Sequence, residues 1–98
     1  MAPITDEQVE RVRALVAAIP AGRVSTYGDI AAAADLSSPR IVAWIMRTDS
    51  SDLPWHRVIT ASGRPAPHLA TVQLERLRAE GVLAVDGRVP LRDVRHAF

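Results

Sequence analysis

Residues 53–59 read Leu-Pro-Trp-His-Arg-Val-Ile, and the organisation of the rest of the chain follows from them. The helices predicted upstream present this stretch, and the segments predicted downstream close over it. Trp55 is its most restrictive residue, because an indole offers one N–H donor and no nucleophile. Any function of the stretch must therefore use Trp55 as a surface and not as a reacting group.

The composition describes one small folded domain over residues 1–98. Of the 98 residues, 48% are hydrophobic, which suffices for a single modest core and argues against disorder. The absence of cysteine excludes disulfides, thiolate catalysis and cysteine-ligated zinc. His56, His68 and His96 lack the close pairing and companion ligands of zinc sites. We therefore expect no metal and no cofactor.

The charge does not by itself predict a polyanionic partner. The net charge is +1, lower than is usual for a protein that lives by non-specific phosphate contacts. All 12 cationic side chains are arginine, which forks and stacks where lysine cannot, although genome composition explains an all-arginine set equally well. The N-terminus carries no basic-then-apolar signal, and no apolar run approaches ~18 residues. We expect a cytoplasmic protein with no membrane partner.

The first predicted helix covers residues 4–19. Thr5 and Gln8 have the spacing of a capping box, and Ile4 with Val9 has the spacing of the accompanying hydrophobic staple. The apolar residues that follow recur on one stripe, which is typical of a scaffold helix packed on a core.

Two more helices are predicted before residue 53. Thr26 is placed to cap a short helix over residues 27–34, and Ser38 is placed to cap a helix over residues 39–48. Residues 35–37 form the turn between them. Helix, short turn and helix is the helix-turn-helix arrangement, in which the second helix is the recognition helix.

The predicted recognition helix has two unlike faces. At about 100° per residue, one face is apolar and turns to the core: Ile41, Val42, Ile45 and Met46. The other face carries Arg40, Ala43, Trp44 and Arg47. An aromatic side chain between two cations is typical of contact with something flat and anionic. The pattern equally allows Trp44 to pack on a neighbouring loop while the arginines are solvated.

Downstream of residue 59 the sequence predicts a helix and a hairpin. The helix covers residues 69–80 and ends at Gly81. Residues 82–91 are predicted to form a small hairpin around the turn Asp86-Gly87. Residues 92–98 give no prediction. The fold class is mainly α with a small β-hairpin.

Three stretches, in order along the chain, carry a family resemblance. Residues 53–59 resemble the Pro-Cys-His-Arg-Val active-site motif of the O6-alkylguanine-DNA alkyltransferases, with Trp55 in place of the cysteine that accepts the alkyl group. Residues 24–31, Val-Ser-Thr-Tyr-Gly-Asp-Ile-Ala, and residues 80–82, Glu-Gly-Val, resemble further family motifs. The resemblance covers residues 8–91. Loss of the cysteine is the mark of the alkyltransferase-like proteins, which bind the same lesion without repairing it.

This resemblance implies a fold and a function. The fold is the helix-turn-helix, winged-helix-like C-terminal domain of the DNA alkyltransferases. The function is non-enzymatic: the protein binds O6-alkylguanine in duplex DNA through the minor groove and flips the base into a pocket. The alkyl group stays in place, and the complex is flagged for nucleotide excision repair proteins. The resemblance further implies a monomeric, nucleoid-associated bacterial protein.

The resemblance also assigns DNA contacts. Arg40 matches the family's arginine finger, which fills the gap left by the extruded base; an ordinary solvated arginine is the alternative. Tyr27 matches the tyrosine that presses on the phosphate beside the target nucleotide, where a helix N-terminus favours a phosphate oxygen. Ser25 and Thr26 are expected to contact phosphate as well. The remaining members of the predicted DNA-binding face are Ala43, Trp44 and Arg47.

A lesion pocket is expected beside Trp55, whose flat apolar ring suits an alkylated guanine; the alternative is that Trp55 fills the space. The expected lining is Tyr27, Pro54, Trp55, Val58, Arg64 and His68. Alkyltransferase-like proteins use a cationic lid residue against the lesion base, for which Arg64 and His68 are the candidates. His56 and Glu80, which match a relay that activates the cysteine in the enzymes, are expected to remain as a hydrogen-bonded structural pair. Arg57 matches a structural anchor.

Some positions depart from the family pattern and keep other functions open. The family usually has glycine at the position of Ala43, and Trp44 is bulkier than the residues expected beside it. Residues 48–52 form a shorter loop than in the enzymes and lack their hinge asparagine. One alternative is a helix-turn-helix regulator that reads sequence in the major groove. Another is a protein-interaction module that has lost DNA binding.

Overall fold

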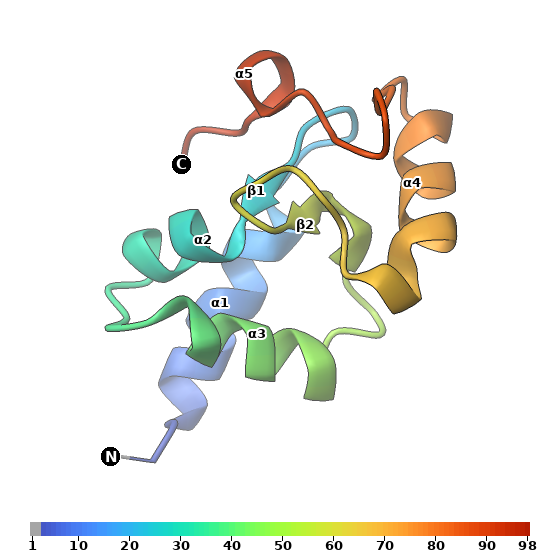
Figure 1. Cartoon of the computed structure of the whole chain (residues 1–98). Coiled ribbons are helices and arrows are strands. Elements are labelled where there is room, and N and C mark those ends of the chain that lie inside the picture. The colour runs from blue at the N-terminus through green and yellow to red at the C-terminus, as the bar shows by residue number, and fades with distance from the viewer. Residues whose placement is uncertain (1–2) are drawn as a thin grey trace.

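The computed structural model describes residues 3–98, in which a two-stranded sheet lies at the centre of the helices (Figure 1). The elements, in chain order, are α1 (Asp6–Ala17), β1 (Ser25–Thr26), α2 (Tyr27–Ala33), α3 (Pro39–Thr48), the 3₁₀ turn η1 (Trp55–Arg57), β2 (Val58–Ile59), the 3₁₀ turn η2 (Pro67–Leu69), α4 (Ala70–Ala79) and α5 (Leu91–Val94). The fold is thus mainly helical, as predicted. Among residues 3–98, no helix combines the length and apolar composition that a membrane crossing requires.

The helix starts follow the predicted local signals. At α1, the backbone N–H of Gln8 donates to the Thr5 hydroxyl at 3.1 Å, and the Gln8 side chain accepts from the Thr5 N–H at 3.0 Å. This confirms the capping box. At α2 the Thr26 hydroxyl accepts from the Asp29 N–H at 3.0 Å, and at α3 the Ser38 hydroxyl accepts from the Arg40 N–H at 3.1 Å.

The helix-turn-helix is confirmed, and α3 has the predicted bounds. Asp35 adopts a φ of 57°, the left-handed conformation that lets the chain leave α2 sharply. The Leu36 N–H then donates to the Ala31 carbonyl at 2.8 Å. The buried side chains of α1, α2 and α3 meet in one core: Val12, Val16, Ile19, Ile30, Ala31, Ala34, Val42, Ile45, Met46 and Val58.

The parallel pairing of β1 with β2 is not among the predicted features. Ser25 pairs with Val58 and Thr26 pairs with Ile59. The pairing joins the segment that enters α2 to the segment that leaves η1. It therefore brings together two of the three stretches of sequence that carry the family resemblance, residues 24–31 and 53–59.

The predicted hairpin over residues 82–91 shrinks to a single bridge. Val85 and Arg88 exchange backbone hydrogen bonds of 2.9 and 3.0 Å around Asp86-Gly87, both of which have positive φ, as an Asp-Gly turn requires. The next hydrogen-bonded pair of an antiparallel ladder would join Leu83 to Pro90, and proline has no N–H to donate. The Val89 N–H points away from the facing arm and donates to the Gly63 carbonyl at 2.8 Å. The predicted Asp-Gly turn is confirmed, and the arms predicted around it pair only at this bridge.

The chain after α4 packs over a second core and runs back to β1. Gly81, with a φ of 88°, ends α4 as predicted, and the Val82 N–H returns to the Leu77 carbonyl at 2.9 Å. A second core lies under this part: Val24, Ile59, Leu77, Val82 and Val89. The tail then runs beside Val24, whose N–H donates to Val94 at 2.9 Å and whose carbonyl accepts from His96 at 2.7 Å.

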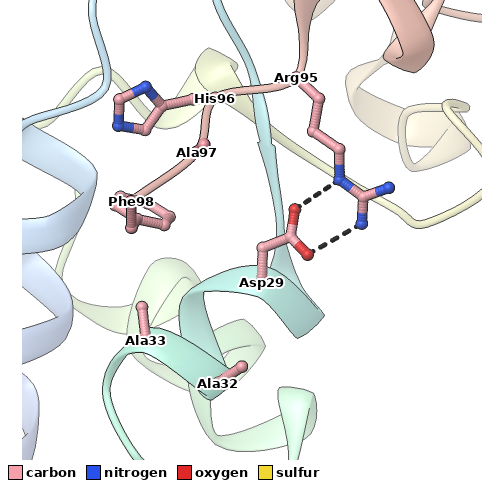
Figure 2. A pocket seen from close by; sticks show the side chains of 7 residues that line it. All are labelled: Asp29, Ala32, Ala33, Arg95, His96, Ala97 and Phe98. Atoms are coloured by element: carbon pink, nitrogen blue, oxygen red, sulfur yellow. Dashed lines mark hydrogen bonds and ion pairs between the residues drawn. The ribbon is translucent and has the colours of Figure 1, made fainter.

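The tail also reaches α2. Figure 2 shows the Asp29 carboxylate facing the Arg95 guanidinium, with two bonds of 2.7 and 2.8 Å. The rings of His96 and Phe98 meet edge to face with centroids 4.8 Å apart. Between the tail and α2 lies a shallow hollow of about 370 Å³, whose charged pair, Asp29 and Arg95, is already satisfied internally.

Candidate nucleic-acid interface

A cavity of about 540 Å³ opens beside the exposed face of α3. The start of α2, the inner edge of α3, the loop after α3, η1 and η2 all contribute to it. Its lining consists of Tyr27, Ala43, Met46, Arg47, Thr48, Asp49, Ser50, Ser51, Trp55, Ala66, His68 and Leu69. The cavity thus combines apolar and aromatic surface with a few polar groups, as small-molecule and base pockets do.

The structure brings only part of the predicted pocket together. Tyr27, Trp55 and His68 line the cavity. Val58 does not, because it belongs to β2 and is 1% exposed. Arg64 turns away and donates to the Asp86 carbonyl at 3.2 Å. The assignments of Val58 and Arg64 to the pocket were therefore wrong.

Pro54 is half-buried beside Trp55 and does not itself line the cavity, so its place in the pocket stays a prediction. The loop that the sequence indicates to be shorter than in the enzymes supplies part of the outer wall, through residues 48–51. Sequence reasoning missed the contributions of Ala66 and Leu69. Met46 lies in the core, as predicted, and its exposed edge reaches the cavity.

Trp55 forms one wall and leaves the cavity open. It packs against the main core and meets His56 edge to face, with centroids 6.2 Å apart. The guanidinium carbon of Arg76 lies 5.1 Å from the Trp55 ring centroid, a cation–π contact. The alternative in which Trp55 fills the space is not what the structure shows. On the facing side, burial raises the pKa of the Tyr27 phenol, which remains a neutral donor near pH 7.

Behind Trp55, the side chains of His56 and Arg57 converge on Glu80. Nε2 of His56 lies 2.7 Å from the Glu80 carboxylate and donates to it, since a carboxylate only accepts. Arg57 donates through Nε at 3.0 Å and through Nη2 at 2.7 Å, while its Nη1 reaches the Ile19 carbonyl at 2.9 Å. The Gly22 N–H adds a bond of 3.1 Å.

These contacts determine the charge of Glu80. The Arg57 hydrogen bonds, supported by His56 and Gly22 and opposed by burial, lower the pKa of Glu80 from 4.5 to about 2. Glu80 is therefore ionised at neutral pH, and its carboxylate accepts hydrogen bonds from His56, Arg57 and Gly22. Nδ1 of His56 is buried and has no partner among residues 3–98. The group ties η1 to α4 and to the turn before β1, and it faces no nucleophile.

The exposed face of α3 carries the predicted set of side chains. Arg40, Ala43, Trp44 and Arg47 are all exposed. Trp44 is 46% exposed and joins neither core, so it does not pack under a loop. Within residues 3–98, the guanidinium groups of Arg40 and Arg47 make no hydrogen bond or ion pair.

Ser25 and Thr26 occupy a different environment from the one expected. They are 0% and 1% exposed, since both are strand residues of β1. The Thr26 hydroxyl is used as the cap of α2. Neither side chain can reach a phosphate in this conformation, so the expectation of direct contacts was wrong. The Thr26 cap fixes the start of α2, of which Tyr27 is the first residue.

No metal site accompanies these groups in the part of the chain that the structure describes: no three histidine, aspartate or glutamate side chains of residues 3–98 lie together as ligands would. The arrangement is a cavity with an aromatic wall, next to a cationic helix face. Such an arrangement can bind a flat group and an anionic backbone at the same time.

Comparison with known sequences gives relatives that share most of this chain. The family model for the DNA-binding domain of 6-O-methylguanine DNA methyltransferase matches residues 7–82. A DNA base-flipping protein of Escherichia coli (strain K12) is 39% identical over 98 residues, which cover 92% of this chain and 74% of that protein. Alkyltransferase-like protein 1 of Schizosaccharomyces pombe is 37% identical over 84 residues, 79% of this chain and 78% of that protein.

Solved structures give the same picture. Atl1 of S. pombe, in complex with damaged DNA containing O6-carboxymethylguanine, superposes with a TM-score of 0.87 at 30% identity, covering 98% of this chain and 100% of that one. O6-methylguanine methyltransferase of Mycobacterium tuberculosis superposes with a TM-score of 0.67 at 28% identity, covering 86% of this chain and 53% of that one. The chain therefore belongs to the family of the 6-O-methylguanine DNA methyltransferase DNA-binding domain.

Proposed function

We propose that the protein recognises O6-alkylguanine in duplex DNA, rotates the damaged base into the cavity beside Trp55, and leaves the alkyl group in place. The observation that carries this proposal is the open cavity of about 540 Å³ whose wall is Trp55, at the position where the resembled motif has its alkyl-accepting cysteine. The relatives named for base flipping and the Atl1 complex with damaged DNA support the same kind of DNA recognition.

The duplex docks on α3 and on the start of α2. Arg40 and Arg47 are cations without internal partners among the described residues, so both are available to the sugar-phosphate backbone or to the bases. Tyr27 is the first residue of α2 and lines the cavity. In the docked complex it therefore lies between the DNA backbone and the pocket. Flipping a nucleotide costs on the order of a few kcal/mol, least for a damaged base. Arg40, stacked in the vacated space, offsets part of that cost.

The flipped base meets mixed surface inside the cavity. The Trp55 ring, with Met46 and Leu69, offers apolar area to the base and to its alkyl group. His68 is the lid candidate that lines the cavity, whereas Arg64 is bonded elsewhere. We assign to His68 the polar contact with the lesion base.

Alkyl transfer is absent from this proposal for chemical reasons. An indole is not a nucleophile toward an alkyl carbon, and the chain contains no cysteine. The His56 ring is already bonded to Glu80 at 2.7 Å. The product is then a long-lived complex of a monomer with damaged DNA, which we propose is handed to nucleotide excision repair proteins.

A titration with two short duplexes, identical except for one O6-methylguanine, tests the proposal. Binding is measured at two salt concentrations, because phosphate attraction falls with salt and base recognition much less. We expect a clear preference for the lesion, and digestion of the recovered DNA should return O6-methylguanine intact. Equal affinity for both duplexes would contradict lesion recognition, and no binding at low salt would favour an interaction module without DNA.

A further inference from the structure

One wall of the cavity is a loop that α3 does not hold along its whole length. Residues 48–51 all line the cavity. Asp49 is the C-terminal cap of α3, with φ −151° and ψ 58°, so the chain leaves helical geometry there. At the end of α3, the Thr48 hydroxyl donates to the Trp44 carbonyl at 2.8 Å. The start of the loop is held to α3 by the Ser50 hydroxyl, which donates to the Met46 carbonyl.

The outer part of the loop is held from α1 by Arg13. Nη1 of Arg13 donates to the Asp49 carbonyl at 2.9 Å, to the Asp49 carboxylate at 3.2 Å and to the Asp52 carboxylate at 3.0 Å. Nη2 donates to the second Asp52 oxygen at 2.5 Å. The guanidinium thus binds the Asp52 carboxylate in fork geometry, which an ammonium cannot reproduce, and contacts Asp49 through Nη1 alone.

Arg13 acts on the cavity without entering it. Its side chain is 20% exposed, it lies on α1 beside the buried Val12, and it is not part of the lining. The hydrogen bond with Asp52 raises the pKa of Arg13 and lowers the pKa of Asp52, in keeping with a formed ion pair. The loop is therefore tied to a helix whose own position is set by the core.

We propose that Arg13 is a positioning residue for lesion selectivity: by fixing Asp49 and Asp52 from α1, it sets residues 48–51 as the outer wall of the cavity and so determines which O6 substituents fit. The proposal rests on the proposed function. A wall fixed before binding contributes contacts without an ordering cost, whereas a released wall first has to be ordered. The binding of a lesion with a small substituent depends most on a wall that is already in place. The binding of a lesion with a bulky substituent depends on it least.

The variant Arg13→Gln removes the ion pairs and keeps a polar side chain. We expect it to bind a duplex with O6-methylguanine about fivefold more weakly, because the wall is no longer fixed before binding. Binding to the unmodified duplex should not change. Binding to an O6-benzylguanine duplex should fall less than binding to the O6-methylguanine duplex, so the preference between the two lesions shifts toward benzyl.

Matched variants separate this role from a general loss of stability. Arg92→Gln makes the same charge change on α5, where within residues 3–98 the arginine has no bonded partner, and should leave all three affinities unchanged. Arg13→Lys should restore the preference only in part. Asp52→Asn, on the exposed loop, should reproduce the shift, and the double variant with Arg13→Gln should add little to either single change.

Fluorescence anisotropy with the three duplexes gives the affinity ratios directly. If the parent protein prefers the lesion while Arg13→Gln and Asp52→Asn both keep its methyl-to-benzyl ratio, Arg13 has no role in selectivity and the proposed function stands. If the double variant shows the full sum of two independent losses, the clamp is refuted as a unit. A parent protein without any lesion preference would overturn the proposed function and this inference together.

Discussion

Replacing Glu80 by glutamine would remove the charge on which His56 and Arg57 converge. Glutamine keeps the size of the side chain but leaves Arg57 and His56 without a carboxylate acceptor in a site where the Glu80 side chain is only 15% exposed. Glu75→Gln is the matched control, because Glu75 lies on the same helix, is exposed and has no bonded partner within residues 3–98.

The magnitude follows from the pKa of Glu80. Folding lowers that pKa from 4.5 to about 2. At about 1.4 kcal/mol per unit, the ionised carboxylate contributes about 3 kcal/mol to the free energy of unfolding at neutral pH. For a domain of this size the loss corresponds to a fall in Tm of roughly 12–24 °C.

The sign of the pH dependence is fixed by the direction of the shift. Since the folded-state pKa is the lower one, the stabilisation is fully present above pH 4.5 and is lost as the pH falls toward 2. The parent should therefore approach the stability of Glu80→Gln in acid. Urea unfolding at pH 7, 5 and 3, followed by circular dichroism, measures the difference directly. A difference below about 1 kcal/mol at pH 7, or one that stays constant down to pH 3, would refute the view of Glu80 as the centre of this network.

Three further predictions concern DNA. Arg40→Ala and Tyr27→Ala should each weaken binding to an O6-methylguanine duplex by about tenfold, on the order of one charged or neutral hydrogen-bonded contact, as measured by anisotropy; a variant that binds like the parent loses its assigned role. Trp55→Ala should remove the preference for the lesion while leaving binding to undamaged duplex intact, and an unchanged preference would contradict the pocket wall. Trp44→Ala should weaken both duplexes alike, by about fivefold if the ring stacks on the DNA at roughly 1 kcal/mol; unchanged affinity would place Trp44 outside the interface.

Local chemistry explains which parts of the fold could be predicted. The starts of α1, α2 and α3 depend on Thr5, Thr26 and Ser38, whose side chains bond within three residues of themselves. The end of α4 depends on the positive φ of Gly81. Such contacts join residues that are close in the sequence, and they can therefore be inferred without tertiary structure.

The features that escaped prediction depend on contacts between distant residues. The sheet consists of two residues in each strand, too short for any periodicity, and Ser25 meets Val58 only in the folded chain. Backbone hydrogen bonds hold the tail to Val24. No pattern of side chains in the sequence predicts these bonds. In the sequence, Arg64 and His68 are equivalent candidates for the lid residue. In the structure, Arg64 donates to the Asp86 carbonyl in a distant turn.

The presence of Glu80 behind Trp55, in a chain without cysteine, has a structural explanation. Arg57 links the carboxylate to the end of the α1 segment through the Ile19 carbonyl, and Gly22 links it to the turn that enters β1. Because β1 pairs with β2, which directly follows η1, the network and the sheet hold η1 from both sides. Trp55 is the first residue of η1, so the same contacts that would orient a reactive side chain also fix the plane of an inert one. On the proposed function, Trp55 therefore depends on the carboxylate of Glu80 for its position in the cavity wall, although no residue at this position reacts.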